Sequence, residues 1–509
     1  MFEKCSFRAN IHILMLKLLY KTFLIGFCCT LVTYNISYSQ NQPALAITNV
    51  TVIDGNGGEP LFDQTVLIRN GSIEEIGKAS SIKVPKSAKI IDGKGKFLTP
   101  GFVDSNVHAS IYGGMNRPET VIKYESQSEA LVTEFAQLQL KYGVTTIRDS
   151  FGTLIPLMAV RDRINRGEVV GPRMLVAGNI VGWGGPFSVS WALAKPSDIN
   201  VFQEHWNDFI TQGSGEELMD MLPEELSVAI NKYLDKGPDF IKYGGTSHFD
   251  NPVMIGFSPR AQKVIVDETH KRGLIAETHS TNLEGLRLSI EAGIDLIQHP
   301  EHATRVLPDE LVQMIKDRNI ICAMLSNTIT GEVWQQHVQK RKAVLESIKK
   351  RDEAFGPGHI KSSTQKGREA QEAGDYMEIA RTNAKKLIEA GCLVTIGTDN
   401  YQGSAPEFLR APKPPNQEPG SGSIMAIEGL VELGMTPAQA IVSVTRTGAM
   451  AAKGLDRFGT IEKGKMADMV LLDADPLTDI SNIRKINTVI KDGKVIDISR
   501  LPEKPVFRK

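Results

Sequence analysis

Eight short apolar segments alternate with longer amphipathic segments through the middle of this chain, and this alternation restricts the fold more than any other feature. The apolar segments are strand-sized and have polar or glycine residues at or next to their ends: FLTPGFVD, VTTIRD, RMLVAGN, DFIKYGG, LIAETHS, IDLIQHP, IICAMLS and LVTIGTD. Amphipathic segments between them, such as 128–143, 258–273, 281–293 and 307–319, end in Gly or Asn, as helices do. The pattern predicts an α/β fold with a (β/α)8 TIM-like barrel, and an open doubly wound sheet is the alternative.

Short β-branched segments flank the barrel region at both ends of the chain. Before it, Asn-Gly and Asp-Gly turns separate ALAITNVTVIDGNG, QTVLIRNGSIEEIG and AKIIDGKGKFLTPG, which predicts antiparallel hairpins. The same composition returns in DRFGTIEKGKMADMVLLDADP and NTVIKDGKVIDISR. We therefore expect a small β-sandwich domain made from residues 40–98 and 456–509, and a barrel domain at residues 99–455. Two long insertions, 184–224 and 327–373, are expected over the carboxyl-terminal face of the barrel, where loops shape the pocket.

Residues 1–39 have the pattern of a signal peptide. The segment FLIGFCCTLVTY (23–34) is uncharged and apolar, and small residues follow it before Gln40. Four basic residues precede it: Lys4, Arg8, Lys17 and Lys21. We expect export to the periplasm or the extracellular space, and a retained N-terminal membrane anchor is the alternative. The apolar segment is too short for a comfortable span, so no stable membrane span is expected in the mature chain.

Charge and cysteine content narrow the class of ligand and the redox chemistry. With 58 basic and 59 acidic side chains the formal net charge is −1, which gives no electrostatic footprint for nucleic acid. The expected ligand is therefore a small molecule. Beyond the leader only Cys322 and Cys392 remain, which predicts buried thiols, although a disulfide between them stays open.

Residues that bind metals or transfer protons lie at the carboxyl ends of the predicted strands: His108, Lys242, His279, His299 and Asp399. In a barrel all strands point the same way, so these five side chains would converge on one pocket. Imidazole and carboxylate groups suit Zn²⁺ and similar cations, and an open coordination position makes such a site catalytic. The joint placement therefore predicts a metal-dependent active site.

Lys242 needs a separate explanation, because an ammonium group has no lone pair and repels a cation. Burial lowers the pKa of a lysine, and the neutral amine can then react with carbon dioxide to give an anionic carbamate. Carboxylation at the terminal nitrogen would turn Lys242 into a ligand able to bridge two metals. An unmodified Lys242 would instead form a salt bridge or bind substrate.

From about Ala44 to Ile498 the chain resembles the amidohydrolase superfamily, most closely the branch with imidazolonepropionase-like proteins and Xaa-Pro dipeptidases (prolidase-like). His279 and His299 are 20 residues apart, which is the separation that this branch shows between its fifth-strand and sixth-strand ligands. The stretches that carry the resemblance are TPGFVDSNVH, GVTTIRD, DFIKYGG, AETHSTNLEGLRLSIEAGIDLIQHPEH, AGCLVTIGTDN and FGTIEKGKMADMVLLDADPL.

The resemblance implies a role for each of these positions. Asn106 and His108 occupy the place of the first-strand His-x-His pair, and Lys242 that of the carboxylated bridging lysine. His279 and His299 correspond to the ligands of the second metal. Asp399 corresponds to the aspartate that binds the first metal and accepts a proton from the attacking hydroxide.

Asn106 departs from the family pattern and weakens the first metal position. Its amide oxygen is neutral and hard, which suits Mg²⁺ or Mn²⁺ better than Zn²⁺. Three interpretations stay open: a working mononuclear enzyme, a dinuclear enzyme with altered metal preference, and a ligand-binding protein without catalysis. A second departure is Pro186, which stands where the branch has the histidine of a Gly-Gly-His motif, and this argues against a direct transfer of dipeptide specificity.

The favoured prediction is an exported metal-dependent amidohydrolase that cleaves the amide bond of a dipeptide, an N-acyl amino acid or a cyclic amide. One or two divalent ions, Zn²⁺ first and Mn²⁺ or Mg²⁺ as alternatives, would activate water while Asp399 shuttles the proton. A metal-dependent isomerase or decarboxylase on the same scaffold is another alternative. The resemblance also implies a homo-oligomer. Six further candidates for the pocket or its surroundings are His248, His302, His359, Trp183, Tyr243 and Trp334.

Overall fold

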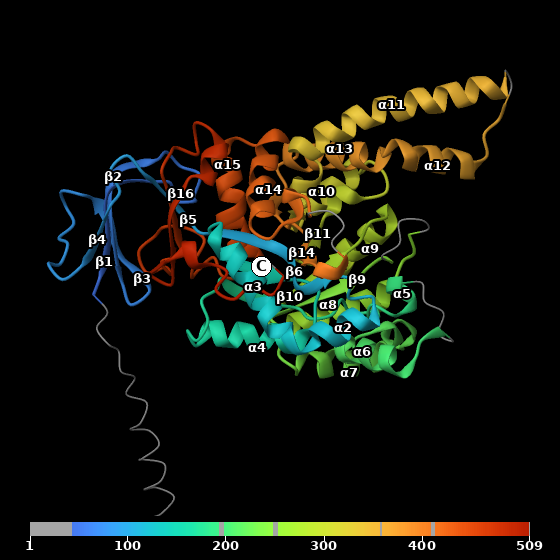
Figure 1. Cartoon of the computed structure of the whole chain (residues 1–509), viewed down its shortest axis with the longest axis horizontal. Helices are drawn as coiled ribbons and strands as arrows, with labels where there is room; N and C mark the ends of the chain where they lie inside the picture. The colour runs from blue at the N-terminus through green and yellow to red at the C-terminus, as the bar shows by residue number, and fades with distance from the viewer. Residues whose placement is uncertain (1–42, 193–197, 248–252, 357–358, 409–412, 508–509) are drawn as a thin grey trace, which may run out of the picture. The chain divides into compact units, whose positions relative to one another are not determined.

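The computed structural model describes residues 43–192, 198–247, 253–356, 359–408 and 413–507 (Figure 1). Residues Leu45–Lys509 form one compact unit. The leader at residues 1–39 and His248 lie outside the described residues. Among the helices that are described, none combines the length and the apolar character needed to cross a bilayer.

The eight apolar segments of the sequence form eight parallel barrel strands within the described residues. They are β6 (Phe102–Gly113), β7 (Val144–Asp149), β8 (Arg173–Val176), β9 (Phe240–Gly244), β10 (Ile275–His279), β11 (Leu296–Gln298), β12 (Ile321–Met324) and β13 (Leu393–Ile396). Strands β6 to β8 pair in one run and β9 to β13 in another, all in parallel register. The predicted strands are therefore present in the predicted order.

Hydrogen bonds join the two runs at both edges, which closes the barrel. Between β8 and β9 the Asp239 amide donates to the Val176 carbonyl oxygen over 2.8 Å, and Val181 pairs with Tyr243 further along. After β13 the Asp399 amide donates to the Asn106 carbonyl oxygen on β6 over 2.8 Å, and β14 (Asn400–Ser404) continues this pairing. A closed ring of strands excludes the open doubly wound sheet.

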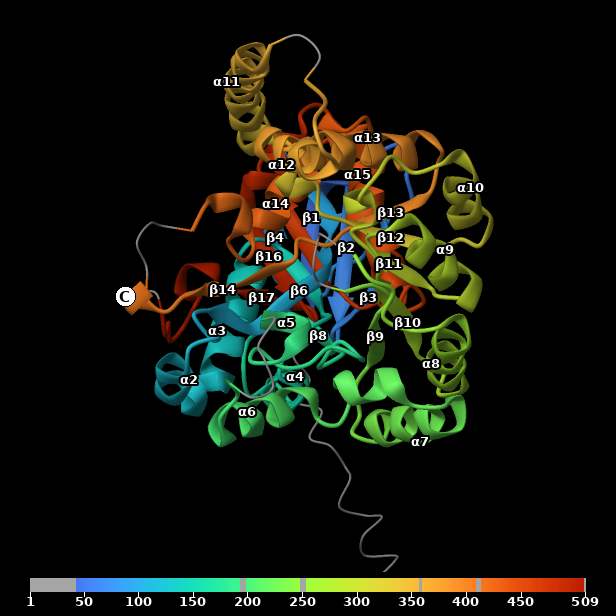
Figure 2. The same cartoon turned by 90° about the vertical axis from the view of Figure 1, so that its right-hand side faces the viewer.

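Helices connect successive strands and cover the outside of the barrel (Figure 2). They are α3 (Ser128–Lys141), α4 (Leu154–Asn165), α7 (Pro223–Leu234), α8 (Pro259–Lys271), α9 (Leu283–Ala292), α10 (Asp309–Asp317), α13 (Asp375–Glu389) and α14 (Ser421–Glu432). Capping fixes their ends: the Ser258 side chain accepts from the Ala261 amide at the start of α8, and Asn282 accepts from Gly285 at the start of α9. The helices predicted at 128–143, 258–273, 281–293 and 307–319 are thus confirmed as α3, α8, α9 and α10.

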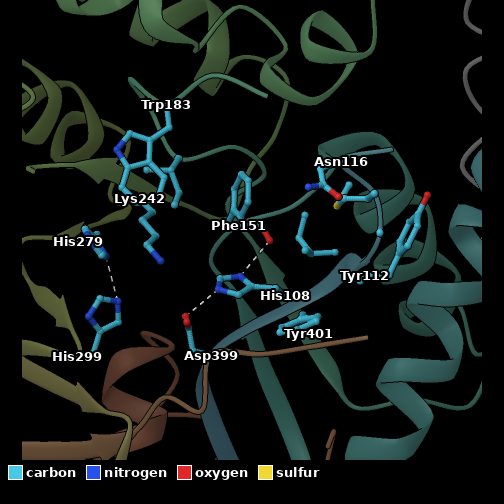
Figure 3. Close-up of a pocket in the computed structure, with 15 residues that line it drawn as sticks. His108, Tyr112, Asn116, Phe151, Trp183, Lys242, His279, His299, Asp399 and Tyr401 are labelled. Atoms are coloured by element: carbon cyan, nitrogen blue, oxygen red, sulfur yellow. Dashed lines mark hydrogen bonds and ion pairs between the residues drawn. The ribbon is translucent and has the colours of Figure 1, made fainter. Parts of the chain in front are cut away.

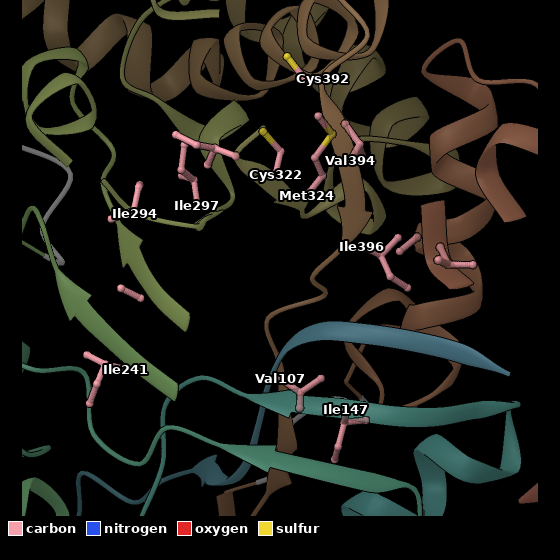
Figure 4. Close-up of a cluster of buried hydrophobic side chains, with 14 of the residues drawn as sticks. Val107, Ile147, Ile241, Ile294, Ile297, Cys322, Met324, Cys392, Val394 and Ile396 are labelled. Carbon is pink, nitrogen blue, oxygen red and sulfur yellow. The ribbon is translucent and has the colours of Figure 1, made fainter. Parts of the chain in front are cut away.

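The main core lies between the strands and these helices (Figure 4). Outward-facing strand residues such as Ile147, Ile241, Ile297 and Val394 are buried against helix residues of the same cluster. Burial of each such side chain contributes about 1.5–3 kcal/mol, so this layer supplies most of the hydrophobic stabilisation. Cys322 and Cys392 belong to this layer as buried free thiols.

Both ends of the unit contribute to a mixed sheet, which within the described residues has eight strands. These are β1 (Leu45–Val52), β2 (Leu61–Arg69), β3 (Ser72–Lys78), β4 (Lys89–Asp92), β5 (Phe97–Pro100), β15 (Met469–Leu472), β16 (Ile486–Lys491) and β17 (Lys494–Ile496). The join between the two chain ends is the antiparallel pair β5–β15. The predicted β structure from both ends is confirmed.

Three predicted hairpins form, and a fourth does not. The first is the antiparallel pair β1–β2. Asn70 and Gly71 join β2 to β3 with φ angles of 52° and 82°, and both positive values match the turn that suits hairpin twist. Asp492 and Gly493 join β16 to β17 in the same way. By contrast β4 and β5 do not pair with each other, because both run parallel to β1, one beside each half of that strand.

The two insertions behave differently. The first contains α5 (Val189–Ala192), α6 (Val201–Thr211) and a short 3-10 turn at Glu216–Asp220, and Trp206 and Ile210 of α6 pack in a cluster that reaches the barrel mouth. The second forms the helical hairpin α11 (Gly331–Phe355) and α12 (Ser363–Ala373), which projects from the barrel (Figure 1). No described residue of either insertion lines the site cavity, so the prediction that both shape the pocket is not confirmed, and only the first packs against residues of the cavity wall.

Candidate active site

A cavity of about 350 Å³ opens at the carboxyl ends of the barrel strands (Figure 3). All five side chains predicted from strand ends line it: His108, Lys242, His279, His299 and Asp399. They come from β6, β9 and β10 and from the residues just after β11 and β13. The five side chains therefore meet in one cavity, as the rule about the ends of parallel strands predicts.

His279 and His299 face each other across the cavity floor. Nδ1 of His279 lies 3.1 Å from Nε2 of His299, and their ring centroids are 4.7 Å apart. Two nitrogens that bind one tetrahedral Zn²⁺ at about 2.05 Å each are separated by about 3.3 Å, so this pair has the spacing that a shared cation requires. Burial lowers the pKa of His299 to about 3, which leaves its ring neutral with a lone pair to offer.

Lys242 is the third group near this pair and is almost fully buried. Burial lowers the pKa of its ammonium, although the negative charges of Asp399, Glu277 and Asp149 act in the opposite direction. The described residues give its Nζ no hydrogen bond or ion pair. A lysine in this setting has the lowered pKa and the access to the cavity that reaction with carbon dioxide needs.

The donor set fits a metal only if Lys242 takes part. Within the described residues no three His, Cys, Asp or Glu side chains are grouped closely enough to hold a metal ion by themselves. A carbamate on Lys242 would supply the anionic third ligand beside His279 and His299, whereas an unmodified ammonium would not. The fit of the site to a divalent cation thus depends on the chemical state of Lys242.

Asp399 forms the opposite side of the floor together with His108. Its Oδ1 lies 2.8 Å from Nε2 of His108, whose Nδ1 lies 3.1 Å from the Phe151 carbonyl oxygen. Both ring nitrogens of His108 therefore lie within hydrogen-bond distance of an oxygen. Burial alone would raise the pKa of Asp399, but the charge and hydrogen bond of His108, with His299 and Lys242, hold it well below its usual range. Its side chain keeps 41% of its surface accessible in the cavity.

Asn106 is fully buried beside Asp399, and both ends of its amide are engaged. Nδ2 donates to Asp399 Oδ1 over 2.9 Å, and Oδ1 accepts the Ser150 hydroxyl. The oxygen is the only atom of this side chain that can bind a cation, and Ser150 occupies it. In this structure Asn106 contacts Asp399 as a hydrogen-bond donor.

The rest of the cavity wall is mostly apolar and aromatic. Trp183 lies over the end of β9, edge-on to the His279 ring with centroids 5.0 Å apart, and its Nε1 donates to the Thr246 carbonyl oxygen. A Cβ on Gly244 would come within 2.1 Å of the Trp183 indole nitrogen, so only glycine at this position lets the ring lie here. The remaining apolar and aromatic residues of the wall are Ile111, Tyr112, Met115, Phe151, Ile180 and Tyr401, and Asn116 is a neutral polar member.

The further candidate residues differ in whether they line the cavity. Trp183 lines the cavity, whereas Tyr243 is buried behind it with its hydroxyl donating to Gln262. The Trp334 ring lies tilted beside His337 on α11, and His359 is exposed beside Phe355. His302 is half-buried with its ring 6.2 Å from that of His299, and Pro186 is buried; neither lines the cavity.

Sequence reasoning missed Ser150, Phe151 and Tyr401. Ser150 and Phe151 directly follow β7, so the strand-end rule that identified His279 also applied to them, but neither residue type signals metal chemistry. Tyr401 lies on β14, a short strand after β13 that the apolar pattern does not reveal. The six consecutive wall residues 111–116 also went unnoticed, because they read as an ordinary end of a strand and loop.

Comparison with known proteins agrees with the geometry of this site. A family model described as the amidohydrolase family matches residues 97–496, which includes all eight barrel strands and the five cavity residues. The chain belongs to the amidohydrolase family. Imidazolonepropionases and a Xaa-Pro dipeptidase also match, which confirms the branch that the sequence predicted.

Three similar proteins match nearly the whole chain. The structure of phenylurea hydrolase B has 30% identity and a TM-score of 0.78, covering 91% of this chain and 99% of that one. The structure of molinate hydrolase has 29% identity and a TM-score of 0.78, covering 92% of this chain and 97% of that one. Ochratoxinase from Aspergillus niger is 24% identical over 479 residues, which is 90% of this chain and 88% of the relative.

Proposed function

We propose that this amidohydrolase cleaves an amide-type carbon–nitrogen bond in a small, uncharged and largely apolar substrate with the help of a divalent metal. The observation that carries the proposal is the meeting of His279 and His299 nitrogens 3.1 Å apart with Lys242 and Asp399 in one apolar-walled cavity. A carboxylate beside two close imidazoles in an open cavity is a typical arrangement for metal-assisted hydrolysis.

His279, His299 and carboxylated Lys242 are the proposed metal ligands. Carboxylation joins the neutral Lys242 amine to the carbon of carbon dioxide and releases one proton, so no oxidant or further reactant is needed. A bound divalent ion would supply Lewis acidity, lowering the pKa of water and polarising the scissile carbonyl. Zn²⁺ is the favoured ion for two imidazoles and one anionic oxygen, with Mn²⁺ and Mg²⁺ as alternatives.

Asp399 is the proposed proton carrier. Its Oδ1 already accepts hydrogen bonds from His108 and Asn106, and no described residue bonds to Oδ2, which stays available to the cavity. Asp399 would accept a proton from the attacking water and return it to the leaving nitrogen. His108 stabilises the carboxylate form before the reaction, so Asp399 begins as a base.

We propose that Asn106 orients Asp399 instead of binding a second metal. Its oxygen is held by Ser150, and its amide nitrogen donates to Asp399 Oδ1, so the Asn106 amide links the carboxylate to Ser150. This arrangement favours the mononuclear enzyme over the dinuclear enzyme and the inactive binding protein.

The cavity wall supports an uncharged substrate. Among the described lining residues the only Lys or Arg is Lys242, which the proposed chemistry occupies, so a free substrate carboxylate has no cationic partner there. Aromatic and aliphatic side chains form most of the wall and suit an aryl or alkyl substituent. Phenylurea hydrolase B is named for an aromatic urea, which agrees with such a pocket. Dipeptides and N-acyl amino acids, which carry a carboxylate, are therefore expected to be poorer substrates.

A substrate panel with purified protein tests the proposal. It contains neutral anilides and aryl ureas, a cyclic amide, and carboxylate-bearing partners of matched size, including dipeptides and N-acyl amino acids. We expect kcat/KM for the neutral members to exceed that of matched acids by at least about tenfold. Asp399→Asn should lose most turnover and keep its fold. Near-normal activity of that variant would refute the proton-carrier role, and turnover without water addition would favour the isomerase or decarboxylase.

Metal analysis tests the cofactor and the competing binding protein. We expect about one divalent ion per chain, loss of activity on chelation, and its return with Zn²⁺. Intact-mass analysis should show a carbon dioxide adduct that disappears in Lys242→Ala. Less than about half an equivalent of metal after growth in supplemented medium would favour a non-catalytic binding protein.

We also propose that the chain is exported, on the strength of the leader pattern at residues 1–39. Expression of the full sequence followed by fractionation and N-terminal sequencing tests this, with cleavage near Gln40 as the expected result. An uncleaved chain in the membrane fraction would favour the anchored alternative.

A further inference from the structure

The described chain ends in a segment, Glu503–Phe507, that crosses helix α3 and reaches the back of the cavity wall. Its backbone amides are bound by polar side chains that α3 buries. The Glu503 amide donates to Gln137 Oε1 over 2.8 Å, and the Val506 and Phe507 amides donate to Glu134 Oε2 over 2.6 and 3.3 Å. Just before this segment, Lys141 Nζ donates to the Leu501 carbonyl oxygen over 3.0 Å.

These contacts explain why α3 carries polar groups on a buried face. Glu134 and Gln137 are each only 1% exposed, and a carboxylate or amide at such a position is costly unless hydrogen-bonded. Donors from the 503–507 segment meet both groups, and charge-assisted bonds to Glu134 are the stronger ones. The segment is thus anchored by side chains from an element distant in sequence.

Phe507 then contacts the wall of the cavity from behind. Its ring lies edge-on to Tyr112 and Tyr124, with centroids 5.8 and 4.9 Å apart, and these two tyrosines are 6.1 Å from each other. Tyr112 lines the cavity, whereas Tyr124 belongs to α2 (Pro118–Tyr124) and is buried outside it. Val506 and Phe507 pack against the same hydrophobic cluster that includes six wall residues: Ile111, Tyr112, Met115, Phe151, Ile180 and Trp183.

We propose that Glu503–Phe507 is a strap that sets the size of the substrate pocket, with Phe507 as a positioning residue that holds Tyr112 against the cavity. The inference rests on the proposed hydrolase function of this site and adds a determinant of its substrate range. Phe507 does not itself line the cavity, so it acts only through Tyr112 and the 111–116 wall. Its removal would leave a void into which Tyr112 can turn, enlarging the pocket on that side. The groups on β9, β10 and β13 that carry the chemistry do not contact it.

The test compares Phe507→Ala with the conservative Phe507→Tyr and with Phe62→Ala, a control on β2 whose ring is 62% exposed. For the best wild-type substrate we expect Phe507→Ala to raise KM about fivefold while kcat changes less than about twofold. For a substrate larger by one fused ring, Phe507→Ala should have the same KM and kcat as wild type. Phe507→Tyr should keep the wild-type KM, and Phe62→Ala should keep the wild-type KM and kcat. Loss of kcat with unchanged KM, or equal losses for both substrates, would overturn the proposal.

A second readout does not require turnover. Hydrogen exchange of peptides covering residues 111–124 should be faster in Phe507→Ala and in Glu134→Gln than in wild type, while peptides of β10 and β13 stay unchanged. Unchanged exchange at 111–124 in both variants would overturn the strap. If wild type cleaves no member of the substrate panel, the proposed function fails, and this exchange measurement still decides whether the strap holds the wall. Phe507→Leu, which keeps apolar volume, replaces the alanine variant if that one does not fold.

Discussion

Two residues of the site, His299 and Asp399, have left-handed backbone conformations, with φ angles of 38° and 54°. For a residue with a side chain such a conformation is unfavourable by about 1–2 kcal/mol, so the surrounding structure must hold it. Strand-like hydrogen bonds do so: the His299 amide donates to Ala323, and the Asp399 amide donates to Asn106. The left-handed turn interrupts the alternation of the strand and lets each side chain line the cavity.

The arrangement around Asp399 predicts that Asn106 acts on catalysis and not on metal content. Asn106→Leu removes the amide donor to Asp399 and leaves the Ser150 hydroxyl without its acceptor. We expect kcat to fall by about 10- to 100-fold, since a misdirected carboxylate transfers protons poorly. Bound metal, measured by mass spectrometry of the purified protein, should stay at the wild-type level.

Ser150→Ala is the matched control, because it keeps the bond between Asn106 and Asp399 and removes only its outer support. A loss of less than about tenfold is expected there. A drop in metal content in Asn106→Leu would instead identify Asn106 as a ligand and revive the dinuclear interpretation.

At the scale of elements, a buried ion pair crosses the inside of the barrel below the cavity. Arg148 on β7 and Glu277 on β10 are both fully buried, and Nη2 of the arginine lies 2.7 Å from Oε2 of the glutamate. The two atoms form an ion pair, but they are not aligned as a hydrogen bond. Gln298 on β11 donates to Glu277, and the Arg148 guanidinium lies over the Phe240 ring on β9 at 4.1 Å. Residues from four strands thus meet in one layer, and Lys242 on β9 lies beside Glu277 in the register of the two neighbouring strands.

Removal of one partner of this pair should be costly. Arg148→Met leaves the Glu277 carboxylate buried without its counter-charge, and we expect the free energy of unfolding to fall by about 3–5 kcal/mol. The double variant Arg148→Met/Glu277→Gln should lose less than the sum of the single changes, because no lone charge remains. Denaturant unfolding of the four proteins of this cycle measures both quantities.

An exposed pair gives the comparison. Arg163 and Glu129 lie 3.2 Å apart with side chains 40% and 51% exposed, so Arg163→Met should cost at most about 1 kcal/mol. Equal losses for the buried and the exposed arginine would show that burial does not strengthen the Arg148 contact.

The elements also show how far the sequence determines the structure. Strands such as IICAMLS and helices such as 258–273 follow from local apolar spacing and caps, so pattern alone located them. His108, Lys242, His279, His299 and Asp399 followed from one geometric rule about strand ends. The role of Asn106 could not be predicted, because it depends on Ser150 from another strand, and the parallel course of β4 and β5 depends on pairing with β1. Contacts between segments distant in sequence leave no local pattern.

At the scale of the whole unit, the terminal sheet and the barrel are joined through a buried carboxylate. Asp468, just before β15, accepts from Arg173 on β8 over 2.9 Å and from Lys491 on β16 over 3.2 Å. The Asp492 amide donates to the same carboxylate over 2.8 Å, and the Asp468 carbonyl oxygen accepts from Gly101, between β5 and β6. Sheet and barrel therefore share one ionic centre, so their stabilities should be coupled.

This junction predicts a pH-dependent stability. Burial alone would raise the pKa of Asp468, but the charges of Lys491 and Arg173 and the Asp492 amide hold it below its ordinary value of 3.8. A carboxyl whose pKa is lower in the folded than in the unfolded state stabilises the fold above the unfolded value and loses this contribution as pH falls through the folded value. We therefore expect Asp468→Asn to lower Tm at neutral pH and to lower the free energy of unfolding by about 3 kcal/mol. The Tm difference from wild type should narrow below about pH 4.

Asp492→Asn is the matched control, because Asp492 contacts the same two cations but its side chain is 49% exposed. Its effect on the free energy of unfolding should stay within about 1 kcal/mol. Thermal unfolding of the three proteins between neutral and acid pH measures these changes in Tm. If the Tm difference between Asp468→Asn and wild type is constant across that range, packing and not the charge joins the sheet to the barrel.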